Sequence, residues 1–344
     1  AYRYQQAQPA AQTLLRIVAF WGVPLPIRML RELTPVDTVA DLQDRITLVV
    51  QCALAVYDRD AGTIDTPPVI RDYLLGQLRP DERTCWHQRA AQSYETQGNE
   101  MEAARHWYLA GEGETAARLL ITHAAAISKR MKGTELAELL ALFQPMDVAP
   151  LTWARLKLLE GQLAEAHANL AKAILAYETA LHADLVVIKA EAHYRLAKIL
   201  EYRNVDEALV HYERGISLLE QTRADPPLLV KMYIHRSWIF IQHRQDLRRA
   251  AASLQRAKDL IDPTNREDYA DLYNASGELF HREGKWVYAI EDRLQAWLAA
   301  KESNDLARIV KIGYNLGGDY AECRRFPQAL TYLNQSRALA LENG

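Results

Sequence analysis

The chain is poor in cysteine, glycine and proline. Its three cysteines, Cys52, Cys85 and Cys323, are too few and too widely spaced for a disulfide framework or a zinc site. Glycine, with 15 residues, and proline, with 13, are scarce in a chain of 344, which disfavours a β architecture rich in turns. The composition therefore predicts an all-α protein, and the cysteine usage predicts a reducing cytoplasm.

Long apolar runs and an excess of positive charge are also missing. No run of 18 apolar residues occurs, so we expect no transmembrane helix and no membrane partner. The formal net charge of −3 gives the chain no general attraction for nucleic acid or anionic lipid. The chain opens at Ala1 without a signal-peptide pattern and ends at Gly344 after a helix-like segment, so we expect a fragment of a larger protein.

Motifs for nucleotide binding, metal binding and catalysis are absent from the sequence. No G-x4-G-K-[ST] phosphate loop occurs, and the loop Gly111–Glu114 is acidic and unsuited to phosphate. The ten histidines form no H-E-x-x-H, H-x3-H or Cys/His group, and no carboxylate is grouped with a nucleophile and an oxyanion donor. We therefore expect no enzyme activity, metal or cofactor in this chain.

A repeated helical hairpin is the main positive feature. Small residues recur at the expected crossing point of each first helix, with successive gaps of 36, 40, 40 and 40 residues, at Gly161, Ala197, Ser237, Gly277 and Gly317. The matching small residues of the second helices are Ala173, Ala208, Ala250, Ala289 and Ala329. Only small side chains let two helix backbones approach closely, so this spacing predicts a solenoid with a curved binding surface.

The second helices resemble the tetratricopeptide repeat. The A-x3-F-x2-A signature of that repeat reads here as Ala173, Tyr177, Ala180, and again as Ala208, Tyr212, Gly215. The resemblance covers roughly half of the chain. It implies a tetratricopeptide-like right-handed superhelical solenoid over residues 151–344.

The first 78 residues predict a winged-helix domain. Helices are expected over 12–21 and 24–33, a third helix starts at Thr38 after Pro35 has ended the second, and 56–64 forms a hairpin. Three helices followed by a hairpin are typical of a winged helix.

The charge of the third helix argues against DNA binding by this domain. It carries Asp41 and Asp44 but only one early cation, Arg45, so it would repel phosphates. We expect no DNA contact through this helix and interpret the domain as one that packs against protein.

The order of the segments resembles the C-terminal half of a STAND signal-transduction ATPase of the maltose-regulon activator type. The likeness lies in the phrases IRDYLL, HQRAAQSYE and EAARHWYLAGEGETAARLL, which predict amphipathic helices between the two domains. The resemblance implies a winged-helix domain at 1–78, a helical arm at 79–150 and a repeat sensor at 151–344. It also implies a nucleotide-binding core, with ATP or ADP and Mg, outside this chain.

In that family a histidine at the start of an HPLVRDFL-like segment contacts the nucleotide phosphate. The matching position here is Pro67, beside Thr66. Proline offers neither a side-chain donor nor an N–H group, which argues against direct nucleotide sensing from this position.

The candidate ligand-binding residues follow from the geometry of a solenoid, in which the first helices line the concave wall. Residues three before, one after, and four or five after each crossing residue face this wall, and Lys231 and Lys311 lie near it. The candidates are Tyr194, Lys198, Tyr202, Lys231, Trp238, Asn274, Glu278, His281, Arg282, Lys311 and Tyr314. For Tyr194 and Trp238, packing between repeats is an equally good interpretation.

These features favour a non-catalytic sensor that binds an inducer (a peptide, a protein or a small molecule) on the concave surface and relays that event to an ATPase core. Oligomerisation on activation is consistent with the same family. The alternative is a passive tetratricopeptide scaffold for protein–protein interaction, without coupling to nucleotide.

Overall fold

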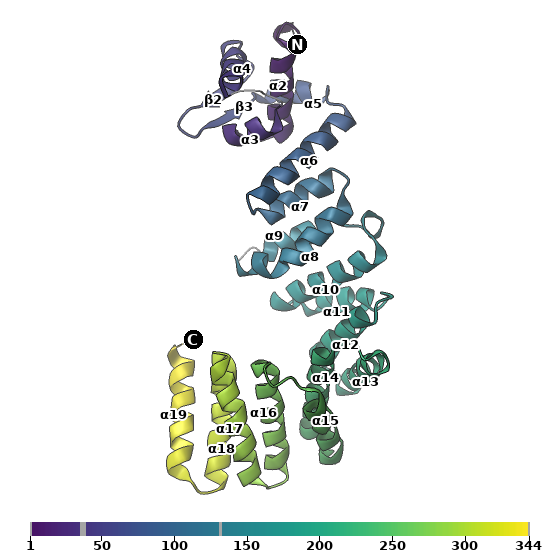
Figure 1. The fold of residues 1–344 in the computed structure, drawn as a ribbon, viewed down its shortest axis with the longest axis vertical. Coiled ribbons are helices and arrows are strands. Elements are labelled where there is room, and N and C mark those ends of the chain that lie inside the picture. The colour runs from purple at the N-terminus through teal and green to yellow at the C-terminus, as the bar shows by residue number, and fades with distance from the viewer. Residues whose placement is uncertain (1, 35–38, 131–132, 343–344) are drawn as a thin grey trace. The chain divides into compact units, whose positions relative to one another are not determined.

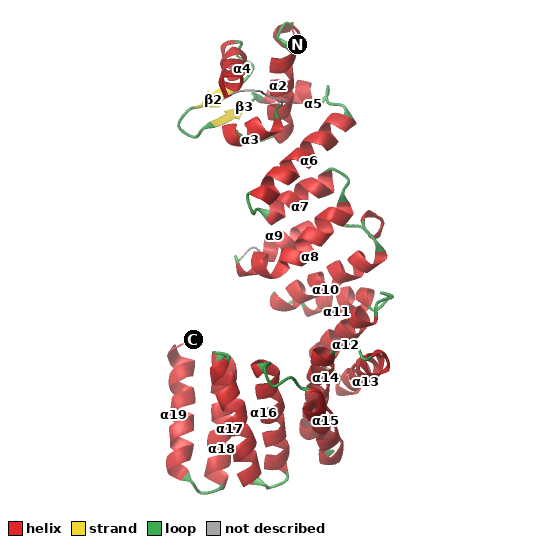
Figure 2. Cartoon of the chain, viewed as in Figure 1, coloured by secondary structure: helices red, strands yellow, loops and turns green. Residues whose placement is uncertain are grey.

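The computed structural model describes residues 2–34, 39–130 and 133–342. The described chain is helical almost throughout, which confirms the predicted all-α class (Figures 1 and 2). It divides into two compact units, Ala1–Leu163 and Ala164–Gly344. The predicted domain boundaries after residues 78 and 150 stay predictions. Within the described residues, no helix is both long enough and apolar enough to cross a membrane.

The first unit begins with helices and a small antiparallel sheet. Its elements are α1 (Tyr2–Gln5), α2 (Pro9–Trp21), β1 (Leu25–Pro26), α3 (Ile27–Leu33), α4 (Val39–Gln51), β2 (Val56–Asp58) and β3 (Thr63–Asp65). Strand β3 lies between β1 and β2, with Ile64 opposite both Leu25 and Tyr57. The predicted hairpin is thus present, but the short strand β1 was missed. The predicted stop at Pro35 and cap at Thr38 lie outside the described residues.

The apolar face of α2 explains how this part packs. Leu14, Leu15, Ile17 and Val18 are fully buried among residues from the neighbouring helices and the sheet. The helix ends at Gly22, whose φ of 76° is a conformation that glycine adopts without strain.

Antiparallel helices complete the first unit. They are α5 (Pro68–Leu75), α6 (Pro80–Thr96), α7 (Glu100–Leu109), α8 (Gly113–Lys129), α9 (Gly133–Leu140), the short 3-10 helix η1 (Pro145–Asp147) and α10 (Pro150–Ala166), in which the unit boundary falls. The three quoted sequence phrases lie in α5, α6 and α7–α8, as predicted.

The second unit is a run of helical hairpins. Its helices are α11 (Leu170–Ala180), α12 (Val186–Leu200), α13 (Val205–Thr222), α14 (Pro226–Ile239), the π-helical turn η2 (Phe240–Arg244), α15 (Leu247–Leu260), α16 (Arg266–Arg282), α17 (Trp286–Glu302), α18 (Leu306–Glu322) and α19 (Phe326–Glu342). Consecutive helices from α11 onward pack together, and the first helices α12, α14, α16 and α18 also contact one another in succession. Figure 1 shows α16 to α19 side by side.

Capping residues fix where these helices begin. A side-chain oxygen accepts a hydrogen bond from the backbone N–H three residues later at Asn169, Asn204, Asp225, Asp246, Asn265 and Asp305. Such caps satisfy one of the free N–H groups of the first turn.

The small residues lie at the helix crossings, as the repeat spacing predicts. A Cβ added to Gly277 would lie 2.6 Å from Cγ of Arg293 and 3.2 Å from the carbonyl oxygen of Ala289. At Gly317 the same distances, 2.6 Å and 3.2 Å, separate the added atom from Cγ of Leu333 and the carbonyl oxygen of Ala329. The register of the last two repeats is therefore confirmed.

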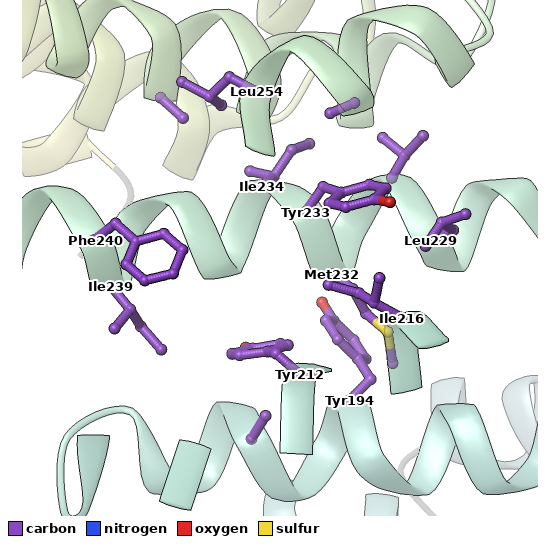
Figure 3. Packing of buried hydrophobic residues seen from close by; sticks show 14 of the residues in the cluster. Tyr194, Tyr212, Ile216, Leu229, Met232, Tyr233, Ile234, Ile239, Phe240 and Leu254 are labelled. Carbon is purple, nitrogen blue, oxygen red and sulfur yellow. The ribbon is translucent and has the colours of Figure 1, made fainter. Parts of the chain in front are cut away.

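The core of the second unit is rich in tyrosine. Tyr194, Tyr212 and Tyr233 lie buried among aliphatic side chains of α12 to α15 (Figure 3). Tyr177 and Tyr212 occupy the aromatic position of the repeat signature, and both are fully buried. Burial of large rings contributes a large share of the apolar area that stabilises such a stack.

Candidate ligand-binding site

A cavity of about 820 Å³ lies against the first helices α12, α14, α16 and α18. Its volume is in the range of sites that bind small ligands or short peptides. Six of the eleven candidate residues line it: Tyr194, Lys198, Tyr202, Lys231, Trp238 and Lys311. The sequence pattern thus brings together side chains from three helices that are distant in the sequence.

Helical spacing explains why these side chains share one wall. Tyr194 and Lys198 are four residues apart and so project from one face of α12, and Tyr202 lies in the turn that follows the helix. Lys231 and Trp238 are two turns apart on α14. Tyr202 is 88% exposed, so its ring is free to contact a ligand.

The π-helical turn η2 extends this wall beyond α14. Gln242 and His243 of the turn line the cavity, whereas Ile241 is buried in the core. A π turn widens the helix by one residue and changes which side chains face outward, and such turns often occur at functional sites. Gln245, with a φ of 51°, ends it. Of the residues four and five after Ser237, Gln242 therefore lines the cavity, whereas Ile241 faces the core.

A chain of hydrogen bonds holds the aromatic floor of the cavity. The Tyr194 hydroxyl lies 3.2 Å from Nε2 of His235, and Nδ1 of His235 lies 3.0 Å from Oε1 of Glu201. The Tyr212 hydroxyl donates to the same carboxylate. Burial raises the pKa of both Tyr194 and Tyr212, so both remain neutral donors. Tyr194 is only 7% exposed, and it therefore packs between repeats as well as lining the cavity.

Three of the cations that line the cavity are paired with carboxylates. Nε of Arg195 lies 2.7 Å from Glu191, and Nζ of Lys231 lies 3.8 Å from Asp268. Arg308 makes two parallel bonds of 3.0 and 2.9 Å to Asp271, which raise the pKa of its guanidinium. These residues were not among the candidates, except Lys231. Several lie in the first turns of α16 and α18, outside the offsets used for the prediction.

Lys198 and Lys311, the other two lysine or arginine residues that line the cavity, contact aromatic rings instead of carboxylates. Nζ of Lys198 lies 5.9 Å from the ring centre of Tyr194, and Nζ of Lys311 lies 5.4 Å from that of Trp238. In the described part of the chain, neither ammonium group has a carboxylate within 4.0 Å. Both ammonium groups therefore lie over aromatic faces, within the range of a cation–π interaction.

The other five candidates do not line this cavity. Asn274 accepts a hydrogen bond of 3.3 Å from Asn315, and Tyr314 is 67% exposed on α18. Glu278, His281 and Arg282 belong to a polar network centred on Arg293. Their roles as ligand contacts stay predictions.

Arg293 of α17 lies almost fully buried at the centre of this network, 2% exposed. Its Nη2 lies 2.5 Å from Glu278, and its Nη1 donates to Asp319, which is also buried. Nδ1 of His281 lies 2.7 Å from the second oxygen of Asp319. Burial raises the pKa of Asp319, an effect that Arg293 opposes. No sequence motif marked Arg293, because it lies on a second helix at a position usually occupied by an apolar residue.

The network reaches the cavity through Gln242. Its amide nitrogen lies 3.2 Å from Glu278, and its amide oxygen accepts a bond of 2.9 Å from Arg282. Gln242 thus connects the cavity wall to the carboxylate that pairs with the buried Arg293. Among the described residues, no three His, Cys, Asp or Glu side chains are grouped so that they could hold a metal ion.

No protein-family model and no curated protein matches this sequence. Solved structures do match its fold. A Signal Transduction ATPase with Numerous Domains (STAND) protein with a tetratricopeptide repeat sensor, from Pyrococcus horikoshii, matches over 98% of this chain and 51% of its own, with 15% identity and a TM-score of 0.54. The chain thus spans about half the length of that protein.

Two shorter proteins match as well. BtubC (BKLC) from P. vanneervenii is 18% identical over 63% of this chain and 91% of its own, with a TM-score of 0.50. The apo form of RapI is 11% identical over 76% of this chain and 99% of its own, with a TM-score of 0.53. At these identities the likeness establishes the fold alone, a tetratricopeptide-like helical solenoid.

Proposed function

We propose that this chain is the sensor region of a STAND-type regulator and that its repeats bind an inducer in the cavity on α12, α14, α16 and α18. The cavity is the observation that carries the proposal, because six residues chosen from the repeat geometry line it. The likeness in fold to a STAND protein with a repeat sensor over 98% of the chain supports the same assignment.

The proposed mechanism is a population shift. Four successive first helices border the cavity, so a ligand that contacts all of them stabilises one curvature of the solenoid over others. The winged-helix domain (1–78) and arm (79–150) would relay this change to an ATPase core. A ligand shifts such an equilibrium only by its difference in affinity for the two forms.

The relay would be mechanical and would not pass through a nucleotide contact at Pro67. This residue immediately precedes α5 and has no N–H group to offer to a phosphate. Thr66 beside it is buried, and its hydroxyl has no hydrogen-bond partner within the described structure. ATP or ADP with Mg would bind to the core and not to this chain, which has no catalytic role in this proposal.

Ligand capture by the full chain tests the binding step. The chain is mixed with random hexapeptides and with small molecules from a cell extract, and retained compounds are identified by mass spectrometry after gel filtration. We expect a retained ligand that the Trp238→Ala variant no longer binds and the Tyr314→Ala variant still binds. Of these two residues, only Trp238 lines the cavity. Equal retention by both variants would place the ligand elsewhere on the repeats.

The second candidate is a passive scaffold that binds a protein partner without nucleotide coupling. The match to BtubC and RapI favours it, because each of these chains is covered almost completely and so shares the solenoid without requiring a further core. A phosphate loop in the gene upstream of Ala1, with ATPase activity that the captured ligand changes, would support the sensor. Failure to capture any ligand, together with no such loop, would support the scaffold.

A further inference from the structure

We infer that the ligand of this cavity is an acidic peptide whose carboxylates contact Lys198 of α12 and Lys311 of α18 together. The inference rests on the proposed function, that the cavity binds a ligand, and it adds the chemical class of that ligand. It also adds a geometric requirement, that one ligand contacts both lysines. The two lysines lie on α12 and α18, and the first helices α14 and α16 come between these two in the order of the repeats.

The inference depends on which cations of the cavity wall already pair with a carboxylate. Arg195, Lys231 and Arg308 already have carboxylate partners in the cavity wall. Among the described residues, Lys198 and Lys311 have no carboxylate within 4.0 Å and lie over the rings of Tyr194 and Trp238. A cation–π contact at an accessible site is weaker than a charge-assisted hydrogen bond to a carboxylate, so an incoming carboxylate gains these two ammonium groups without breaking an ion pair.

The surrounding acids exclude a densely charged anion. Seven carboxylates line the cavity against five lysine and arginine side chains. A polyphosphate or a nucleic acid would bring many negative charges close to these carboxylates and would be repelled. Two separate carboxylates on a neutral backbone meet the two lysines and leave the acids of the wall to accept hydrogen bonds from peptide N–H groups.

The aromatic residues suit the uncharged parts of such a peptide. Tyr202 is largely exposed in the turn after α12, and Trp238, whose ring lies under Lys311, is only partly buried. Large aromatic side chains often dominate the binding energy of peptide sites because they offer apolar area at low entropic cost. Removal of Lys311 from the Trp238 ring by a ligand carboxylate would also expose that ring to an apolar side chain of the peptide.

Capped hexapeptide sets test the inference on the full chain. All peptides are acetylated and amidated, so that no terminal charge remains, and they differ only in two positions that hold Glu, Gln or Lys at varied spacing. We expect the Glu set to be retained about tenfold better than the Gln set, and the Lys set not to be retained, as for a site that forms charge-assisted hydrogen bonds. Lys198→Gln and Lys311→Gln should each lower retention of the Glu set by about tenfold.

Lys301→Gln is the matched control. Nζ of Lys301 lies 4.1 Å from the ring centre of Trp297, so it makes the same kind of contact outside the cavity. The variant should retain the Glu set like the parent chain. Thermal melting of all three variants checks that they remain folded, which their accessible positions favour.

Four other outcomes of these retention experiments would contradict the inference, and each identifies which part of it is wrong. Equal retention of the Gln set, with loss in Trp238→Ala, would overturn the acidic ligand and leave the proposed function intact. Retention of the Glu set that does not depend on either lysine would also overturn it. Lysine-dependent binding of inorganic polyphosphate without binding of the Glu set would replace the carboxylate ligand by a phosphate. Absence of any ligand, peptide or otherwise, would overturn the inference and the proposed function together.

Discussion

Nδ1 of His87 on α6 lies 2.8 Å from Nδ1 of His106 on α7. A second pair, His193 on α12 and His211 on α13, has the same arrangement at 2.9 Å. At this separation one neutral ring donates its N–H group to the lone pair of the other, and two protonated rings would repel each other. The hydrogen bond of each pair therefore persists while at least one ring is neutral, and it is lost when both rings are protonated.

Acid should weaken both units through these pairs. Burial lowers the pKa of His87, His106 and His193 to about 4, with Arg83 and Arg105 adding to the effect at the first pair. The unfolded chain binds protons below about pH 6.5, so the stabilisation is complete above that pH and is lost as the pH falls from 6.5 to 4. Urea unfolding at pH 7 and pH 5 should give a lower midpoint at pH 5.

A variant isolates the contribution of one pair to this acid sensitivity. His106→Phe keeps a flat ring among the aromatic residues around it and removes a titrating group. Its midpoint should change less between pH 7 and pH 5 than that of the parent chain. Identical midpoints at the two pH values in the parent chain would contradict the role of the pairs.

Gly317→Ala should destabilise the last repeat. The new methyl group would lie 2.6 Å from Cγ of Leu333 and 3.2 Å from a backbone oxygen, and overpacking of this kind costs about 1 to 3 kcal/mol. The control is Gly318→Ala on the same helix, where nothing lies within 4 Å of the added atom and alanine is the better helix former. Thermal melting should separate the two variants, and a melting temperature raised in both would show that the crossing is not tight.

The buried pair of Arg293 and Asp319 should behave as a unit. Arg293→Leu leaves a buried carboxylate without its main partner, which costs about 3 to 5 kcal/mol in comparable pairs. Arg293→Leu combined with Asp319→Leu should be less destabilised than Arg293→Leu alone. The exposed pair of Arg266 and Glu302 is the control, because Arg266→Leu should change the unfolding free energy by at most about 1 kcal/mol. Equal stability of the parent chain and Arg293→Leu would refute the assigned role.

The chain should not bind duplex DNA through α4. This helix has Asp41 in its first turn, and acidic side chains there repel phosphates. Gel-shift assays at low salt should show no complex at micromolar protein concentration. A salt-dependent complex that Arg45→Ala abolishes would contradict this expectation.

The sequence predicted the repeat register well because steric demands leave few alternatives. A Cβ at Gly277 or Gly317 would lie 2.6 Å from a side chain of the next helix, and the same spacing placed Lys198 and Trp238 on the cavity wall. The spacing could not predict Asp271 or Arg308, because pairing between charged side chains of different repeats leaves no periodic pattern.

Local features explain why some residues at the predicted offsets do not line the cavity. The π turn at Phe240–Arg244 changes the residue count after Ser237, so Ile241 faces the core. Arg293 draws Glu278 into an ion pair, and no count along α16 could reveal a partner that comes from α17. The short strand β1 was missed because a strand of two residues has no detectable alternation.

Arg293 and Leu333 occupy equivalent places in two neighbouring hairpins, below Gly277 and Gly317 respectively. The hairpin that contains Arg293 supplies one carboxylate partner itself, Glu278, and takes a second, Asp319, from the hairpin that follows it. Leu333 makes no such demand. The two hairpins are therefore not interchangeable modules. A rearranged array in which they were swapped would leave the buried arginine with Glu278 of its own hairpin but without Asp319, so this second ion pair favours the order in which the hairpins are joined.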